Sequence, residues 1–139
     1  MPIYHLYQIR LDDAQIAAVN SGNDDDGIGS DYMQGRLGQV SGAIKRGLHQ
    51  FTAIVKARNL EDLFHKTNAI DEPWINGPNV LMVVTGAAST SCGDIAVDCE
   101  NNEAWLCATV GWEALDWGRA ARVIIEAKSI LTPDDTPQP

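Results

Sequence analysis

Side chains that can do chemistry gather between residues 91 and 107. Ser91 and Cys92 are candidate nucleophiles, Asp94 is a candidate acid or base, and one of the histidines would serve as a partner base. No motif fixes the geometry of such a set, and a single cysteine beside a strand is more often a small buried hydrophobe. A hydrolase-like enzyme that uses Asp94 with a cysteine or a histidine is therefore kept as an alternative to a binding protein.

The cysteines and histidines do not follow the spacing of a metal site. Six and seven residues separate the successive cysteines, there is no C-x-x-C, and the histidines are scattered along the chain. An odd number of cysteines without a signal peptide favours free thiols in a reducing cytoplasm. We therefore expect no metal, no other cofactor and no disulfide among these residues: Cys92, Cys99, Cys107, His5, His49 and His65.

Residues 83–89, VVTGAAS, look like the opening of a nucleotide-binding turn. Such a turn needs further glycines where this chain has Thr90 and Cys92, and it needs a helix where the pattern continues as a strand. A phosphate-binding loop fails as well, because Gly93 is followed by Asp94 in place of Lys. The sequence therefore predicts no nucleotide cofactor.

Charge is distributed unevenly along this chain of 139 residues, which has a formal net charge of −9. Residues 1–70 carry 8 acids and 7 bases, whereas residues 71–139 carry 11 acids and 3 bases. Binding to nucleic acid or to an anionic membrane needs cations, so we expect neither partner. A run of acids is either a solvated face that aids solubility or a docking face for a basic partner. A face that imitates the charge of DNA is a weaker form of the second interpretation.

The acidic half of the chain contains the candidate partner-binding residues. The stretch 67–118 has no Lys or Arg, and its acids flank a predicted hairpin, where we expect them to face solvent. A second acidic pair lies next to a tryptophan, a residue type that is common at the centre of interfaces. The candidates are Asp98, Glu100 and Glu103 at the hairpin, with Asp71, Glu72 and Trp74 in the second group.

The first half of the chain begins with a predicted strand over residues 3–11, where side chains alternate. Asp12 or Asp13 can cap a short helix, and residues 22–30, with three consecutive aspartates, predict a mobile loop. Residues 32–49 have apolar side chains at helical spacing and several glycines, which predicts one helix able to pack closely on a neighbour. Self-association through this glycine-rich helix, as a homodimer, is the expectation if the chain is a structural or regulatory module.

Further strands are predicted at residues 51–57, 80–84, 93–98 and 104–110. Asn59 is placed to cap a helix over 60–67, Asn101 and Asn102 suit a hairpin turn, and the apolar stripe from Trp117 to Leu131 predicts a last helix. The order of elements predicts one α+β domain over residues 1–131, with helices packed on one face of a mixed or antiparallel sheet that includes a C-terminal β-hairpin. Residues 132–139 are expected to form a disordered tail.

Three segments together resemble a known family. Residues 59–70 (NLEDLFHKTNAI), 89–97 (STSCGDIAV) and 105–113 (WLCATVGWE) are similar to the YodL/KfrB-like modules of phages, plasmids and other mobile genetic elements. The resemblance covers residues 58–116, and its motifs are structural. It implies an accessory protein of a mobile element and supplies no mechanism.

The resemblance and the charge together lead to one functional expectation. We expect a small acidic cytoplasmic protein that binds a host protein with a basic surface, as a counter-defence inhibitor of the anti-restriction or anti-CRISPR type. Under this expectation the chain is not an enzyme. The enzyme that uses Asp94 and the structural or regulatory module of plasmid maintenance remain the alternatives.

Overall fold

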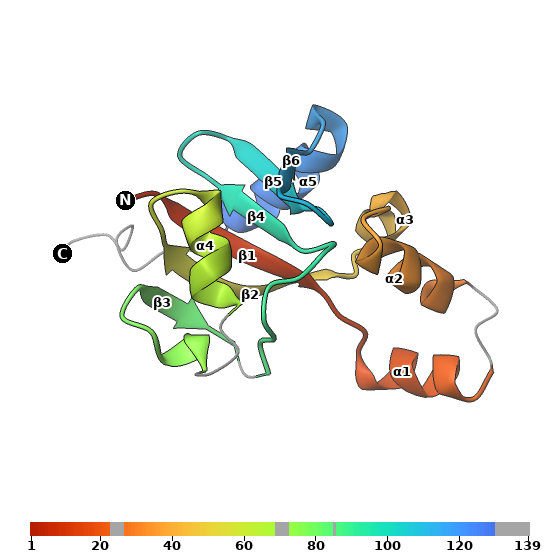
Figure 1. Ribbon diagram of the computed structural model, residues 1–139. Coiled ribbons are helices and arrows are strands. Elements are labelled where there is room, and N and C mark those ends of the chain that lie inside the picture. Colours follow the sequence, from red (N-terminus) through yellow and green to blue (C-terminus); the bar gives the residue numbers. More distant parts are fainter. Residues whose placement is uncertain (23–26, 69–72, 85, 130–139) are drawn as a thin grey trace.

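A six-stranded antiparallel sheet forms the centre of the computed structural model (Figure 1). The structure describes residues 1–22, 27–68, 73–84 and 86–129. The strands lie in the order β3-β2-β1-β4-β5-β6, so the first strand of the chain is central and the chain crosses from one side of the sheet to the other between β3 and β4. The α+β class predicted from the order of elements is confirmed, and all strand pairs are antiparallel.

The elements have the following bounds. The strands are β1 (Ile3–Ile9), β2 (His49–Lys56), β3 (Val80–Val83), β4 (Ile95–Asp98), β5 (Glu103–Cys107) and β6 (Trp112–Ala114). The helices are α1 (Asp13–Asn20), α2 (Ile28–Arg36), α3 (Ser41–Arg46), α4 (Leu60–Thr67) and α5 (Trp117–Lys128), with a short 3-10 helix η1 (Trp74–Asn76).

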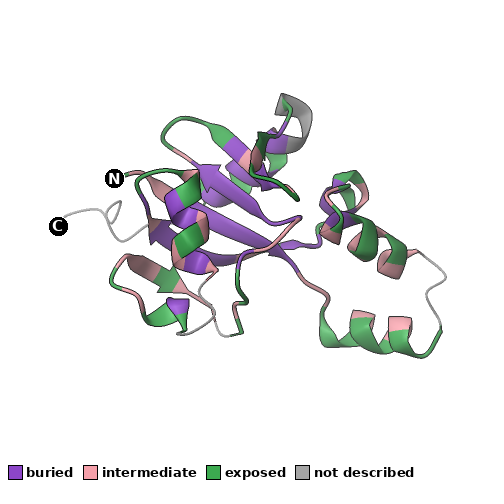
Figure 2. Cartoon of the chain, viewed as in Figure 1, coloured by how far each residue is buried: buried purple, intermediate pink, exposed green. Residues whose placement is uncertain are grey.

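The core has two parts because β1 is buried on both faces. Tyr7 and Ile9 pack with α3 and α5 on one face, whereas Tyr4 and Leu6 pack with α4 and η1 on the other. Figure 2 shows the resulting buried centre of the sheet. The expectation that the helices share one face is therefore wrong. Successive side chains of β1 point to opposite faces of the sheet, and both faces carry apolar residues. Both faces must therefore be covered by helices.

The predicted single helix over residues 32–49 is also wrong, because the chain forms α2, α3 and the start of β2 there. Gly38 has a φ of +94°, a left-handed conformation that ends α2 and that a glycine adopts without strain. Met33 and Leu37, two of the apolar residues at helical spacing in this segment, are 62% and 73% exposed. The small residues pack within the chain: a Cβ on Gly35 would lie 2.6 Å from the Ile9 side chain.

Several local predictions are confirmed. Asp12 caps α1, Asn59 caps α4, and Asn102 has the left-handed φ of 54° expected at the β4–β5 turn. The strand predicted over 104–110 ends at Cys107, since the chain turns at Gly111 and returns as β6, an element that the sequence did not indicate. The loop predicted over residues 22–30 is wrong at its end, because α2 begins at Ile28. Residues 23–26 of that loop and the tail predicted at 132–139 lie outside the described residues.

Candidate functional site

The acidic hairpin joins β4 to β5, with Asp98 paired opposite Glu103. Asp98 is only 6% exposed, so the expectation that it faces solvent is wrong. Its Oδ1 accepts the backbone N–H groups of Glu100 and Asn101 at 3.1 and 3.2 Å, and its Oδ2 accepts the Asn101 side-chain amide at 2.8 Å. A carboxylate that binds the backbone two and three residues later fixes a turn. Asp98 therefore shapes the hairpin and does not present its charge to a partner.

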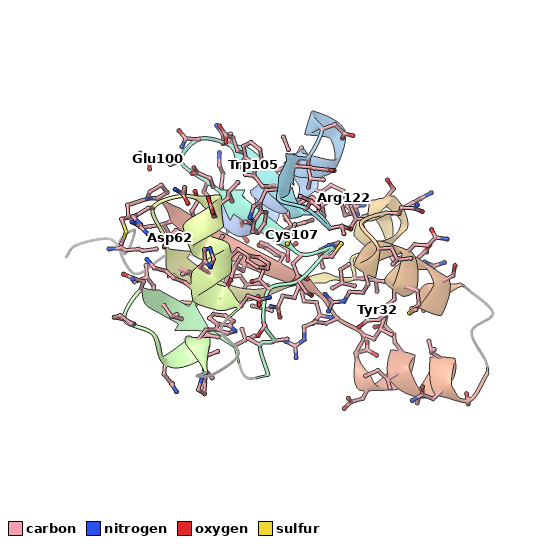
Figure 3. The ribbon with its side chains drawn as sticks, viewed as in Figure 1. Tyr32, Asp62, Glu100, Trp105, Cys107 and Arg122 are labelled. Carbon is pink, nitrogen blue, oxygen red and sulfur yellow. The ribbon has the colours of Figure 1, made fainter. Side chains whose placement is uncertain are left out.

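Glu100 (labelled in Figure 3) and Glu103 are the exposed acids of this hairpin, and we name the pair the hairpin acids. The Trp105 indole donates to Glu103 Oε2 at 3.0 Å and holds that side chain beside the strand. Lys128, at the end of α5, forms a hydrogen bond to the Asn102 side chain in the same turn. The hairpin acids are thus carried by an ordered turn, with one cation beside it.

The second predicted group is only partly described. Asp71 and Glu72 lie outside the described residues. Trp74 is 6% exposed and packs in the core with Leu63 and Val55, because η1 turns the indole inward against α4 and β2. Burial removes the Trp74 ring from the surface at which a partner would contact it, so its placement differs from the one expected of an interface residue.

Asp94 is a buried carboxylate, 1% exposed, with three hydrogen-bond partners. Its oxygens accept from the Ser91 N–H at 2.9 Å, the Ile9 N–H at 3.4 Å and the Arg36 guanidinium at 3.1 Å. Burial raises the pKa of Asp94 to about 6, although the Ser91 N–H and the Arg36 charge act in the opposite direction. This carboxylate joins β1, β4 and α2, and its burial leaves it no access to a substrate in solvent.

The neighbours of Asp94 are also structural. His49 Nε2 lies 2.7 Å from the Gly93 carbonyl oxygen, and burial lowers the pKa of His49 to about 4, so the imidazole is neutral at pH 7. Cys107 is 3% exposed, and burial raises the pKa of its thiol to about 12. A nucleophilic cysteine needs a lowered pKa and access to solvent, and Cys107 has neither. Cys92 is half-buried, with its sulfur 3.9 Å from the Thr109 hydroxyl.

A second feature, which sequence reasoning missed, is a groove between α1 and α2 with a volume of about 500 Å³. The end of β1, α1 and α2 supply its walls, and Tyr32 projects from α2 on the side that faces α1 (Figure 3). Its lining brings together residues that are up to 27 positions apart, so no motif marks it, although Ile16 and Val19 have the spacing of one helix face. The groove is lined by Ile9, Arg10, Leu11, Ile16, Val19, Asn20, Gly29, Tyr32, Met33 and Arg36.

The comparisons with protein-family models, with curated proteins and with solved structures found no match. The three cysteines are free, and the described residues contain no cluster of His, Cys, Asp or Glu that would suit a metal ion. No described helix has the length and apolar character needed to cross a bilayer.

Proposed function

We propose that this chain is a small acidic accessory protein of a phage or plasmid that binds a host protein in the cytoplasm and inhibits a host defence. The resemblance to YodL/KfrB-like modules suggests the source and the role. The partner in this proposal has a basic surface, of the kind that normally contacts nucleic acid. Catalysis has no part in it.

The observation that carries the proposal is the ordered acidic hairpin. Asp98 holds the backbone N–H groups of Glu100 and Asn101, so the turn has its shape before any partner arrives. An ordered turn loses less conformational entropy on binding than a flexible one. Two exposed carboxylates on it also increase the rate of encounter with a basic surface, and that increase weakens as salt screens the charges.

The test is a pair of charge-reversed proteins. Glu100→Lys with Glu103→Lys changes the net charge from −9 to −5, and so does the control, Asp13→Lys with Glu61→Lys, on α1 and α4. Asp98 is left intact because it shapes the turn. Partners captured from host lysate by the parent protein are identified, and their association rates with all three proteins are measured from 20 to 300 mM salt.

We expect the hairpin variant to associate at least about tenfold more slowly at low salt and to lose most of the salt dependence, whereas the control stays close to the parent. Equal rates for the hairpin variant and the parent would contradict the proposal, because the hairpin acids would then serve only solubility. Equal slowing by both variants would also contradict it, since net charge alone would then govern the rate.

A further inference from the structure

The groove between α1 and α2 has an unusual composition for this chain. In a protein with 19 acids and 10 bases, its lining contains two arginines, Arg10 and Arg36, and no acid. Most of the other lining side chains are apolar, and Ile16 and Met33 remain 43% and 62% exposed. A volume of about 500 Å³ with apolar walls and a few polar groups is typical of a small-ligand site.

The Arg36 guanidinium is held in place on one side. Its Nη1 donates to the Ser91 hydroxyl at 2.8 Å and to Asp94 at 3.1 Å, and its Nη2 donates to the Ile9 carbonyl oxygen at 3.1 Å. The Tyr32 ring lies 5.6 Å from the guanidinium carbon. These contacts fix the orientation of the group without help from a ligand, and a preorganised group loses little entropy on binding.

Three of the five Arg36 N–H donors are used in this way. The Nε–H and the second Nη2–H have no acceptor among the residues that the structure describes, and the Arg36 side chain is 27% exposed at the groove. The Nε–H and Nη2–H of a guanidinium can point in parallel, and together they match the two oxygens of a carboxylate.

The wall that α1 supplies is held loosely. None of its residues is buried, and in Figure 2 the helix carries only exposed and intermediate colours. Figure 1 shows α1 standing away from the sheet, at the end of the molecule opposite the β4–β5 turn. A ligand that contacts Ile16 and Val19 would bury apolar surface of this helix that the chain itself leaves in water.

We propose that the groove between α1 and α2 binds an apolar carboxylate, with the carboxylate on the free donors of Arg36 and the apolar part against Ile16, Val19 and Met33. The carboxylate comes either from a small organic acid or from the C-terminal residue of a peptide, since both present the same group. The site is distinct from the hairpin acids and does not depend on their function.

The test uses the full chain and four probes. These are 4-phenylbutyrate and its amide, and acetyl-Ala-Leu-Leu with a free C-terminus and with an amidated one. Binding is followed in ¹H–¹⁵N spectra through the Arg36 Nε–H signal and the backbone amides of α1. We expect saturable shifts of both sets of signals with at least one of the two acids, and binding at least about tenfold weaker with the matching amide. The acid that binds more tightly shows whether the carboxylate comes from a small organic acid or from the C-terminus of a peptide.

Two variants of α1 provide the matched control. Ile16→Glu places a negative charge in the groove, and Ala17→Glu places the same charge on an exposed residue of the same helix outside it. We expect Ile16→Glu to weaken binding of the acid at least about tenfold and Ala17→Glu to change it less than about twofold. Each of three outcomes would overturn the proposal: neither acid binds, acids and amides bind equally, or the two variants weaken binding to the same extent.

Discussion

Gly93 connects Asp94 with His49. It directly precedes Asp94 in the chain, and its carbonyl oxygen forms a hydrogen bond with the His49 imidazole. Gly93 has a φ of +96°, and a Cβ at this position would lie 2.2 Å from the Gly35 carbonyl oxygen. Only a glycine allows α2 to approach β4 so closely. The same close approach excludes water, and burial therefore shifts the pKa values of the acid and the base in opposite directions.

These two shifts make opposite contributions to the pH dependence of stability. The pKa of Asp94 is raised to about 6, so the folded state binds more protons than the unfolded state between about pH 4 and 6, and stability from this group falls as pH rises. The pKa of His49 is lowered to about 4, so the folded state binds fewer protons between about pH 4 and 6.5, and stability from this group rises with pH. Each shift corresponds to about 3 kcal/mol, and the two contributions largely cancel.

Replacing Asp94 or His49 should therefore expose the pH-dependent contribution that the remaining group makes to stability. Asp94→Asn should be more destabilising, relative to the parent, at pH 4 than at pH 6.5, because the parent alone gains stability when Asp94 is protonated. His49→Gln should behave in the opposite way, with its larger relative cost at pH 6.5. Urea unfolding at the two pH values measures both differences. If both variants show the same trend with pH, the assigned directions of the shifts are wrong.

The helices differ in how strongly they are tied to the core. α4 places Leu63 in the core with 0% exposure, whereas α1 buries none of its residues. Both helices begin with a side-chain cap: Asp12 accepts from the Gln15 N–H at 2.7 Å, and Asn59 accepts from the Asp62 N–H at 2.8 Å. A helix that is not packed can open without unfolding the rest of the chain.

We therefore predict different outcomes for the same kind of cap removal. Asp12→Ala should lower the free energy of local opening of α1 by about 1 kcal/mol. Hydrogen exchange of the α1 amides then becomes about fivefold faster, and the urea midpoint of the whole protein stays unchanged. Asn59→Ala should instead lower the urea midpoint of the whole protein, because α4 covers one face of the sheet. A lower global midpoint with Asp12→Ala would show that α1 unfolds together with the core.

Short-range signals were sufficient for some elements and not for others. The alternation of β1, the cap at Asn59 and the left-handed Asn102 depend on residues within a few positions of one another, and each was predicted. At α2 and α3, the left-handed Gly38 ends the first helix, and the close contacts of Gly35 with Ile9 and Gly93 fix how that helix packs. Such contacts join distant segments, so periodicity alone favoured one continuous helix.

The same limit applied to the candidate sites. The hairpin acids were found from their place beside a turn, but that place alone does not separate the exposed Glu100 from Asp98, which is buried in the assembled sheet. Arg36 was not singled out, since its partners Ser91 and Asp94 lie more than 50 positions away. The groove between α1 and α2 forms only when the end of β1, α1 and α2 pack together in the folded chain.

The whole molecule has a net charge of −9, and mutual repulsion of the acids opposes the compact state. Salt weakens this repulsion, since the screening length falls from about 30 Å at 10 mM to about 8 Å at 150 mM ionic strength. Salt also weakens ion pairs such as Arg46–Asp31, but pairs this close to solvent contribute little to stability. We therefore expect repulsion to determine the direction of the salt effect.

The prediction is that Tm rises by about 2 °C or more between 10 and 150 mM NaCl, as measured by calorimetry at pH 7. Glu100→Gln with Glu103→Gln changes the net charge from −9 to −7, and the two Lys substitutions at the same positions change it to −5, without touching the core. The rise in Tm should therefore decrease in the order parent, Gln variant, Lys variant. A Tm that falls with salt in the parent would mean that attractive pairs, including the partly buried Arg36–Asp94 pair, outweigh the repulsion among the acids.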